Sequence, residues 1–321
     1  MRINIVYTPT DKTFILTLVS LYSLIDNNSD NLLVIYIITG NDFNRKYNKY
    51  FRDLEKFKNV EKIIIKNISL EKYNFVKKYI EYYDTVREHF VLFDIDKYID
   101  EEKILYLNSS TIINCNLSEL YSIDLQSNSC AAAEHIDSTE LILRSNTQRH
   151  TAFNNGVMLI NLKKWKEKRY SELLNTKQFI NLLDTKDPVH ELVFFNTLIQ
   201  DCKIIDFKYN YTEDYISRKL TCSFKTKKMY KNILFHITKP CIITYMGPCT
   251  DGNTPFVKNS YITLWWTYAK KTPIYKNIED FKNSNQYKLT ATSAQNSFKY
   301  TWLLSRIFPY IKPYWFRILL G

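Results

Sequence analysis

Glycine is scarce in this chain, with 5 glycines among 321 residues. No GxGxxG or GxxxxGK[ST] pattern follows any predicted strand, so the sequence does not indicate a dinucleotide-binding or P-loop protein. No stretch reaches the roughly 18 apolar residues that a membrane-spanning helix needs, and the first residues lack the apolar core of a signal peptide. We therefore expect a cytoplasmic protein.

The cysteines show neither a CxxC pair nor the spacing of metal ligands. Several of them lie in apolar, strand-like segments, where a thiol behaves as a small apolar side chain. We expect reduced thiols in the core at all six positions, which are Cys115, Cys130, Cys202, Cys222, Cys241 and Cys249.

Acidic residues are absent after Asp280, and the segment that follows supplies six of the eleven net positive charges. Within it, residues 297–321 mix aromatic, aliphatic and basic side chains, and Pro309 and Pro313 break any helix there. Such composition is typical of segments at an anionic membrane surface. A helix docked on the body of the protein and a partner-binding segment are the alternatives.

We expect one domain over residues 1–280 and a basic, aromatic tail over residues 281–321, peripheral at the inner face of the cell membrane. Binding to nucleic acid is not expected, because the positive charge is concentrated in an apolar tail and no recognised nucleic-acid module is present.

Apolar runs with strand and helix periodicity alternate along the chain. Strands are predicted over residues 3–8, 33–39, 60–68, 103–107, 129–134 and 203–207, and a buried strand that leads into a helix over 153–165. Helices are predicted over 14–24, 43–57, 170–183 and 189–200, with a more polar helical region over 70–98. This order predicts an α/β fold with a mixed, mostly parallel sheet and helices on both faces.

Five segments carry a resemblance to a known family. In chain order they read NIVYTPTD, KILYLNSSTII, FNNGVMLINLKKW, ILFHITKP and LWWTYAKKTPIY. Together they resemble the family-8 retaining glycosyltransferases, which include bacterial lipo-oligosaccharide and capsule galactosyl- and glucosyltransferases and glycogenin. The resemblance covers residues 1–280 and implies a GT-A fold, a UDP-sugar donor and a glycan or lipid-linked acceptor.

The metal-binding segment of that family departs from its pattern here. The family's YLDxD segment holds Mn²⁺ or Mg²⁺ on the donor diphosphate through two aspartates, and the corresponding residues are Asn108 and Ser110. These side chains offer oxygen atoms without charge, so we expect weakened metal binding. His236 aligns with the family's third metal ligand, and a core histidine is the alternative interpretation.

The resemblance also assigns the remaining site residues. It implies that Asn154 and Glu191 contact the sugar and are the candidate catalytic residues. Two other family residues are replaced, an arginine near Leu92 and a sugar-facing glutamine at Leu192. The implied nucleotide-sugar-binding residues are Thr8, Asp11, Lys12, Asn108, Ser109, Asn154, Gly156 and Lys239.

Two hypotheses follow from these replacements. In the first, the chain is an active hexosyltransferase with a changed site, in which Lys12 and Lys239 supply the metal's charge or other side chains rebuild a site. Those other side chains are Asp11, Asp94, Asp96, Glu134, His135 and Glu191. In the second, the chain is an inactive pseudo-glycosyltransferase, a binding or scaffold subunit of an active partner.

Overall fold

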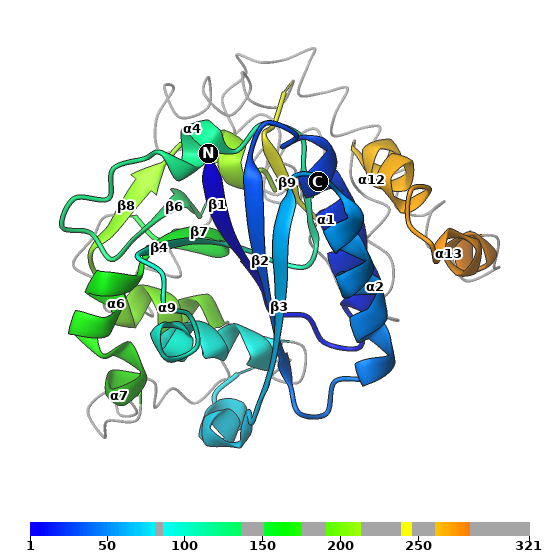
Figure 1. Cartoon of the computed structure of the whole chain (residues 1–321). Coiled ribbons are helices and arrows are strands. Elements are labelled where there is room, and N and C mark those ends of the chain that lie inside the picture. The colour runs from blue at the N-terminus through cyan, green and yellow to red at the C-terminus, as the bar shows by residue number, and fades with distance from the viewer. Residues whose placement is uncertain (81–85, 136–150, 175–190, 213–238, 246–260, 283–321) are drawn as a thin grey trace, which may run out of the picture.

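The computed structural model describes residues 1–80, 86–135, 151–174, 191–212, 239–245 and 261–282, which are coloured in Figure 1. The proposed metal ligand His236 and the tail over 297–321 lie outside these residues. Within them, no helix is long and apolar enough to cross a membrane.

Seven strands form the main sheet, in the order β3-β2-β1-β4-β7-β6-β8. The pairs β3·β2, β2·β1, β1·β4 and β6·β8 are parallel, and β7 runs antiparallel to both β4 and β6. This arrangement confirms the predicted mixed, mostly parallel sheet. The strands are β1 (Arg2–Tyr7), β2 (Leu32–Gly40), β3 (Val60–Ile68), β4 (Lys103–Leu107), β6 (Cys130–Glu134), β7 (Phe153–Asn161) and β8 (Cys202–Ile205).

A second, two-stranded sheet pairs β5 (Thr111–Ile113) with β9 (Ile242–Thr244) in antiparallel register. Because β5 begins just after the segment that resembles the family's metal-binding motif, β9 is brought to the same region from far along the chain. This pairing was not predicted from the sequence.

Helices cover both faces of the main sheet, as predicted (Figure 1). Along β4, Leu105 and Leu107 pack into one buried apolar cluster, and Ile104 and Tyr106 pack into another. This alternation follows from the two-residue period of a strand. The first cluster includes residues of α1 (Phe14–Asp26), α2 (Asn48–Arg52), α4 (Ser118–Tyr121), α12 (Ile262–Ala269) and α13 (Tyr275–Lys282), and the second includes residues of α6 (Leu162–Lys168), α7 (Tyr170–Leu174) and α9 (Glu191–Leu198).

Two predicted helices take another form. The region over 43–57 consists of the short 3₁₀ helices η1 (Arg45–Tyr47) and η2 (Asp53–Lys56) on either side of α2. The polar region over 70–98 contains two 3₁₀ helices, η3 (Glu71–Lys78) and η4 (Arg87–Lys97). In η4 the consecutive residues 90–95 are all buried, so tertiary packing on every side, rather than one apolar stripe, sets its geometry.

Candidate functional site

The candidate site lies where β1 and β4 end. The two strands are parallel neighbours, so the residues that follow them emerge at one edge of the sheet, where open α/β sheets bind ligands. Thr8 follows β1 and Asn108 follows β4. The hydroxyls of Thr8 and Tyr106 lie 3.4 Å apart, and both residues are buried. The structure thus places the expected nucleotide residue Thr8 against Tyr106, two residues before Asn108.

The 108–110 loop is closed on itself by hydrogen bonds. The Asn108 side-chain oxygen accepts from the backbone N–H of Ser110 at 3.1 Å and from its hydroxyl at 3.2 Å. The backbone N–H of Asn108 donates to the carbonyl of Gly156 at 2.9 Å, which ties the loop to β7. These hydrogen bonds hold the loop in place.

These donor atoms do not fit a divalent cation. Asn108 and Ser110 carry no charge, and the Asn108 oxygen that would face a cation already accepts two hydrogen bonds within the loop. Among the residues that the structure describes, no three His, Cys, Asp or Glu side chains gather as metal ligands. The remaining expected ligand, His236, lies outside those residues.

The strand β7 contributes two of the expected sugar-side residues. Asn154 is buried, and its side-chain oxygen accepts from the backbone N–H of Gly156 at 2.9 Å. A Cβ atom on Gly156 would lie 3.2 Å from that oxygen and 3.3 Å from the amide nitrogen of Asn210. A side chain at this position would thus require Asn154 or Asn210 to shift by a few tenths of an ångström, so glycine suits the close packing of this part of β7.

A histidine that the sequence analysis did not single out connects the two sides of the site. His89, in η4, places its Nε2 atom 3.4 Å from the Asn108 amide nitrogen. Its Nδ1 atom lies 3.7 Å from the Glu191 carboxylate, at the first residue of α9. Glu191 is buried, so a carboxylate lies close to the neutral loop. The only sequence signal for His89 was a charged Arg-Glu-His run before an apolar stretch.

Glu88, next to this histidine, is a second buried acid. Its Oε1 atom pairs with Arg87, and its Oε2 atom has no hydrogen-bond partner in the described part of the chain. Burial raises the pKa of Glu88 to about 7, although Arg87 acts in the opposite direction. Arg87 is in turn paired with Asp42 at the end of β2.

Several other expected residues are engaged elsewhere. Asp11 accepts a hydrogen bond from the backbone N–H of Asn44 at 2.8 Å, and Lys12 is exposed. Asp94 pairs with Lys72 and Lys97, whose hydrogen bonds outweigh burial and lower its pKa. The Asp94 carboxylate is thus engaged in ion pairs that stabilise the fold, which argues against a role in a rebuilt metal site.

Leu92, near which the resemblance implies an arginine in the family, is part of the core. Leu92 is fully buried, and its carbonyl accepts a hydrogen bond from the indole N–H of Trp165 at 2.7 Å. Leu192 is buried in the same apolar cluster.

The strand β9 reaches the 108–110 loop through its C-terminal end. Thr244 lies opposite Thr111, and the Tyr245 N–H donates to the Ser110 carbonyl at 3.0 Å. Lys239 precedes the other end of β9, where the Asn114 side chain donates to the Pro240 carbonyl. Because β5 and β9 are antiparallel, Lys239 and Ser110 lie at opposite ends of this strand pair.

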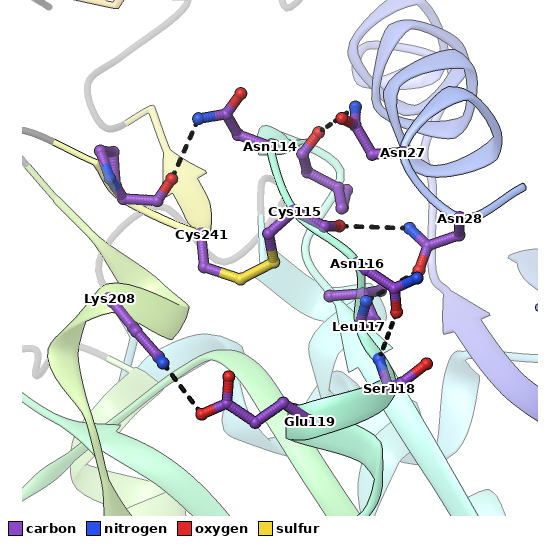
Figure 2. The surroundings of a disulfide bond; sticks show 12 residues. Asn27, Asn28, Asn114, Cys115, Asn116, Leu117, Ser118, Glu119, Lys208 and Cys241 are labelled. Carbon is purple, nitrogen blue, oxygen red and sulfur yellow. Dashed lines mark hydrogen bonds and ion pairs between the residues drawn. A yellow bond between two sulfur atoms is a disulfide. The ribbon is translucent and has the colours of Figure 1, made fainter. Parts of the chain in front are cut away.

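One pair of cysteines departs from the expectation of reduced thiols. Cys115 and Cys241 form a disulfide with their Cα atoms 5.0 Å apart (Figure 2). The expectation was wrong for this pair because the two cysteines, 126 residues apart in sequence, are adjacent once β5 and β9 pair. Cys130 and Cys202 are buried and form no disulfide, as expected, and Cys222 and Cys249 lie outside the described residues.

Comparisons with known proteins identify the family. The model of glycosyl transferase family 8 matches residues 4–249. The chain belongs to this family. It is 29% identical to the glycosyltransferase GlyD of Streptococcus pneumoniae over 54% of the chain, and 28% identical to GlyE of the same organism over 56%. These matches span 20% of GlyD and 40% of GlyE, so the chain corresponds to less than half of either relative.

Solved structures show the same fold. The galactosyltransferase LgtC, in complex with donor and acceptor sugar analogues, superposes with a TM-score of 0.69 at 15% identity, over 84% of this chain and 96% of LgtC. The bifunctional glycosyltransferase WbbM superposes with a TM-score of 0.65 at 14% identity, over 87% of this chain and 51% of WbbM. At these identities the likeness establishes the GT-A fold, and the chemistry has to be argued from the site.

Proposed function

We propose that this chain binds a UDP-sugar where β1 and β4 end and transfers its hexose, with retention, to a glycan or lipid-linked acceptor in bacterial surface polysaccharide assembly. In this proposal Asn108, Ser109 and Ser110 flank the diphosphate, Asn154 and Glu191 contact the sugar, and Thr8 and Asp11 approach the base. The observation that carries the proposal is the convergence of Asn108, His89 and Glu191, which keeps a buried carboxylate next to the neutral loop.

The loop and the carboxylate supply different chemistry. The side chains of Asn108 and Ser110, both partly exposed, can hydrogen-bond phosphate oxygens as neutral groups. Glu191 can accept hydrogen bonds from sugar hydroxyls, and its burial strengthens such bonds because water competes less for them. Binding of Mn²⁺ or Mg²⁺ is weak in this proposal, since the described donors of the loop carry no charge.

Calorimetric titration of UDP, UDP-glucose and UDP-galactose, each with and without Mn²⁺, tests the proposal. We expect binding that changes little with Mn²⁺. Binding that requires the metal would show that ligands outside the described residues hold it. No binding under either condition would contradict the proposed function.

The second candidate is an inactive subunit that retains the fold and binds an active glycosyltransferase. The neutral side chains at Asn108 and Ser110 favour it, because stabilisation of a diphosphate leaving group ordinarily relies on a cation. Measurement of hexose release from radiolabelled UDP-hexose distinguishes the two candidates: binding without any turnover over a panel of acceptors supports the scaffold. A neighbouring gene for the same family with both aspartates intact would support it as well.

We also propose that residues 281–321 bind an anionic membrane surface, at the cytoplasmic face, and so bring the site to lipid-linked acceptors. The basis is composition: basic and aromatic residues alternate along 297–321, without any acid. The described chain ends in α13 at Lys282, so the first two residues of this segment belong to that helix.

A further inference from the structure

The orientation of the Asn108 side chain dictates the chemistry of its neighbour His89. The Asn108 oxygen accepts two hydrogen bonds from Ser110, so the amide nitrogen is the atom that faces His89, with 3.4 Å between it and Nε2. An amide nitrogen only donates. The Nε2 atom of His89 must therefore act as acceptor, and the neutral ring carries its proton on Nδ1.

The Nδ1 side of the ring is directed at Glu191. The distance from Nδ1 to the nearer Glu191 oxygen is 3.7 Å, longer than a hydrogen bond, and the buried Nδ1 atom has no hydrogen-bond partner among the described residues. Hydrogen bonds in active sites are often long before substrate binds and shorten in the complex. A small shift of either side chain converts this contact into an Nδ1–H donor on the carboxylate.

The surroundings keep the histidine ring in this place. His89 is 15% exposed, and its ring meets that of Tyr106 edge-on with centroids 6.4 Å apart. Tyr106 lies on β4 two residues before Asn108, and the buried residues 90–93 of η4 fix the backbone that carries His89. The ring, the loop and Glu191 thus come from three separate elements, which are η4, the end of β4 and α9.

We propose that His89 is a positioning residue that orients Asn108 and Glu191 together, so that the diphosphate and the sugar of one donor molecule are bound in register. This inference rests on the proposed function for the roles of Asn108 and Glu191. It assigns to His89 two simultaneous hydrogen bonds, accepted at Nε2 from Asn108 and donated from Nδ1 to Glu191. Loss of a residue that orients metal ligands in a comparable way typically costs about 10- to 100-fold in affinity or activity, which gives the scale of the effect expected here.

The tautomer can be measured directly. In the protein labelled with ¹⁵N-histidine, two-bond ¹H–¹⁵N correlation spectra distinguish Nδ1–H from Nε2–H rings, and His89→Gln identifies the His89 signals by their loss. We expect an Nδ1–H ring in the wild type. In Asn108→Asp, a carboxylate acceptor faces Nε2, so we expect a proton there. An Nε2–H ring in the wild type, or no change in Asn108→Asp, would overturn the assignment.

Donor binding tests the role itself, by calorimetry with UDP and UDP-galactose. His89→Phe keeps a ring beside Tyr106 but can neither accept nor donate, so we expect UDP-galactose to bind about tenfold more weakly. UDP alone should lose less affinity, because it lacks the sugar that Glu191 contacts. His89→Gln offers one acceptor and one donor and should recover part of the loss. A merely structural role would lower stability in both variants without separating UDP from UDP-galactose.

Lys97→Met is the matched control, since Lys97 is exposed on the same 3₁₀ helix and pairs with Asp94 away from the site. It should leave both affinities unchanged. If the wild type binds both compounds and His89→Phe binds them with the same affinities, the role of His89 is overturned while the proposed function stands. Failure of the wild type to bind either compound would overturn the proposed function, and the role of His89 with it.

Discussion

The backbone N–H of Tyr245 donates to the carbonyl oxygen of Ser110 at 3.0 Å. This bond joins the end of β9 to the 108–110 loop, which resembles the family's metal-binding segment in sequence. The residue that β9 presents next to it is Thr244, whose hydroxyl donates to the side-chain oxygen of Asn210 at 2.6 Å. Asn108, Ser110 and Thr244 thus surround this part of the site with neutral side chains that already have hydrogen-bond partners.

Restoring carboxylates at this loop should restore metal binding. We expect Asn108→Asp combined with Ser110→Asp to raise the affinity for Mn²⁺ about tenfold or more, because hard cations gain affinity with each charged oxygen ligand. Calorimetric titration of Mn²⁺ measures the change. Ser69→Asp combined with Ser122→Asp is the control, since both serines are exposed and the added charge is the same. An equal gain in the control would show an effect of net charge and would contradict the assignment of the loop.

Most of the fold could be predicted from the sequence because its strands are continuous apolar runs. The strand predicted over 33–39 lies within β2, whose residues after Leu32 are all buried, and the helix predicted over 14–24 lies within α1. Here local pattern and tertiary packing favour the same structure. The region over 70–98 was predicted as helical, but the 3₁₀ form of η3 and η4 was not, because residues 90–95 of η4 are all buried and leave no single apolar face.

The site could be predicted only in part, since motifs report residues that are close in sequence. The loop at Asn108 and the strand at Asn154 were found because each belongs to a recognisable string of residues. His89 was missed because its partners, Asn108 and Glu191, meet it only through tertiary structure. The Cys115–Cys241 bond was missed for the same reason, as it depends on the pairing of β5 with β9.

The disulfide should contribute substantially to stability. We expect Cys115→Ala combined with Cys241→Ala to lower the free energy of unfolding by about 2–5 kcal/mol, because the bond closes a long loop in the unfolded chain. Urea unfolding measures the difference. In dithiothreitol, the free energy of unfolding of the wild type should fall to that of the double variant. The free energy of unfolding of the double variant should be the same with and without dithiothreitol. Equal stability of oxidised and reduced wild type would contradict the prediction.

This bond also bears on the proposed cytoplasmic location, because reducing compartments keep most thiols unpaired. Mass spectrometry after rapid alkylation of intact cells reports the state of Cys115 and Cys241. Reduced thiols would agree with the proposed location, and a fully formed disulfide would argue for an oxidising compartment.

The tail should determine binding to membranes. We expect deletion of residues 297–321 to abolish sedimentation with vesicles that contain phosphatidylglycerol, since each basic residue near such a surface contributes about 1 kcal/mol. Replacement of Lys299, Arg306, Lys312 and Arg317 by Gln in the full chain keeps the aromatic residues and should weaken binding strongly. Neutral vesicles are the control. Undiminished sedimentation of the deleted chain would exclude the tail as the membrane-binding segment.

Glu88 should make stability depend on pH. The pKa of this carboxyl group is about 7 in the folded protein and near 4.5 in the unfolded chain, because burial disfavours its charged form. Between these values the folded state binds more protons, so its contribution to the free energy of unfolding falls as the pH rises. Glu88→Gln removes this loss. We expect the free energy of unfolding of Glu88→Gln to rise relative to that of the wild type between pH 5 and pH 8, by roughly 3 kcal/mol at most, since each pKa unit corresponds to about 1.4 kcal/mol.

Urea unfolding of both proteins at pH 5, 6, 7 and 8 measures this gain as a difference between variants, so the titration of other groups cancels. Glu102→Gln is the control for the loss of one carboxyl group at an exposed position. Loss of the Arg87 pair in Glu88→Gln lowers stability in the pH range where Glu88 is charged, and so reduces the gain without reversing its direction. A difference between Glu88→Gln and the wild type that stays constant from pH 5 to pH 8 would show that Glu88 is charged throughout, despite its burial.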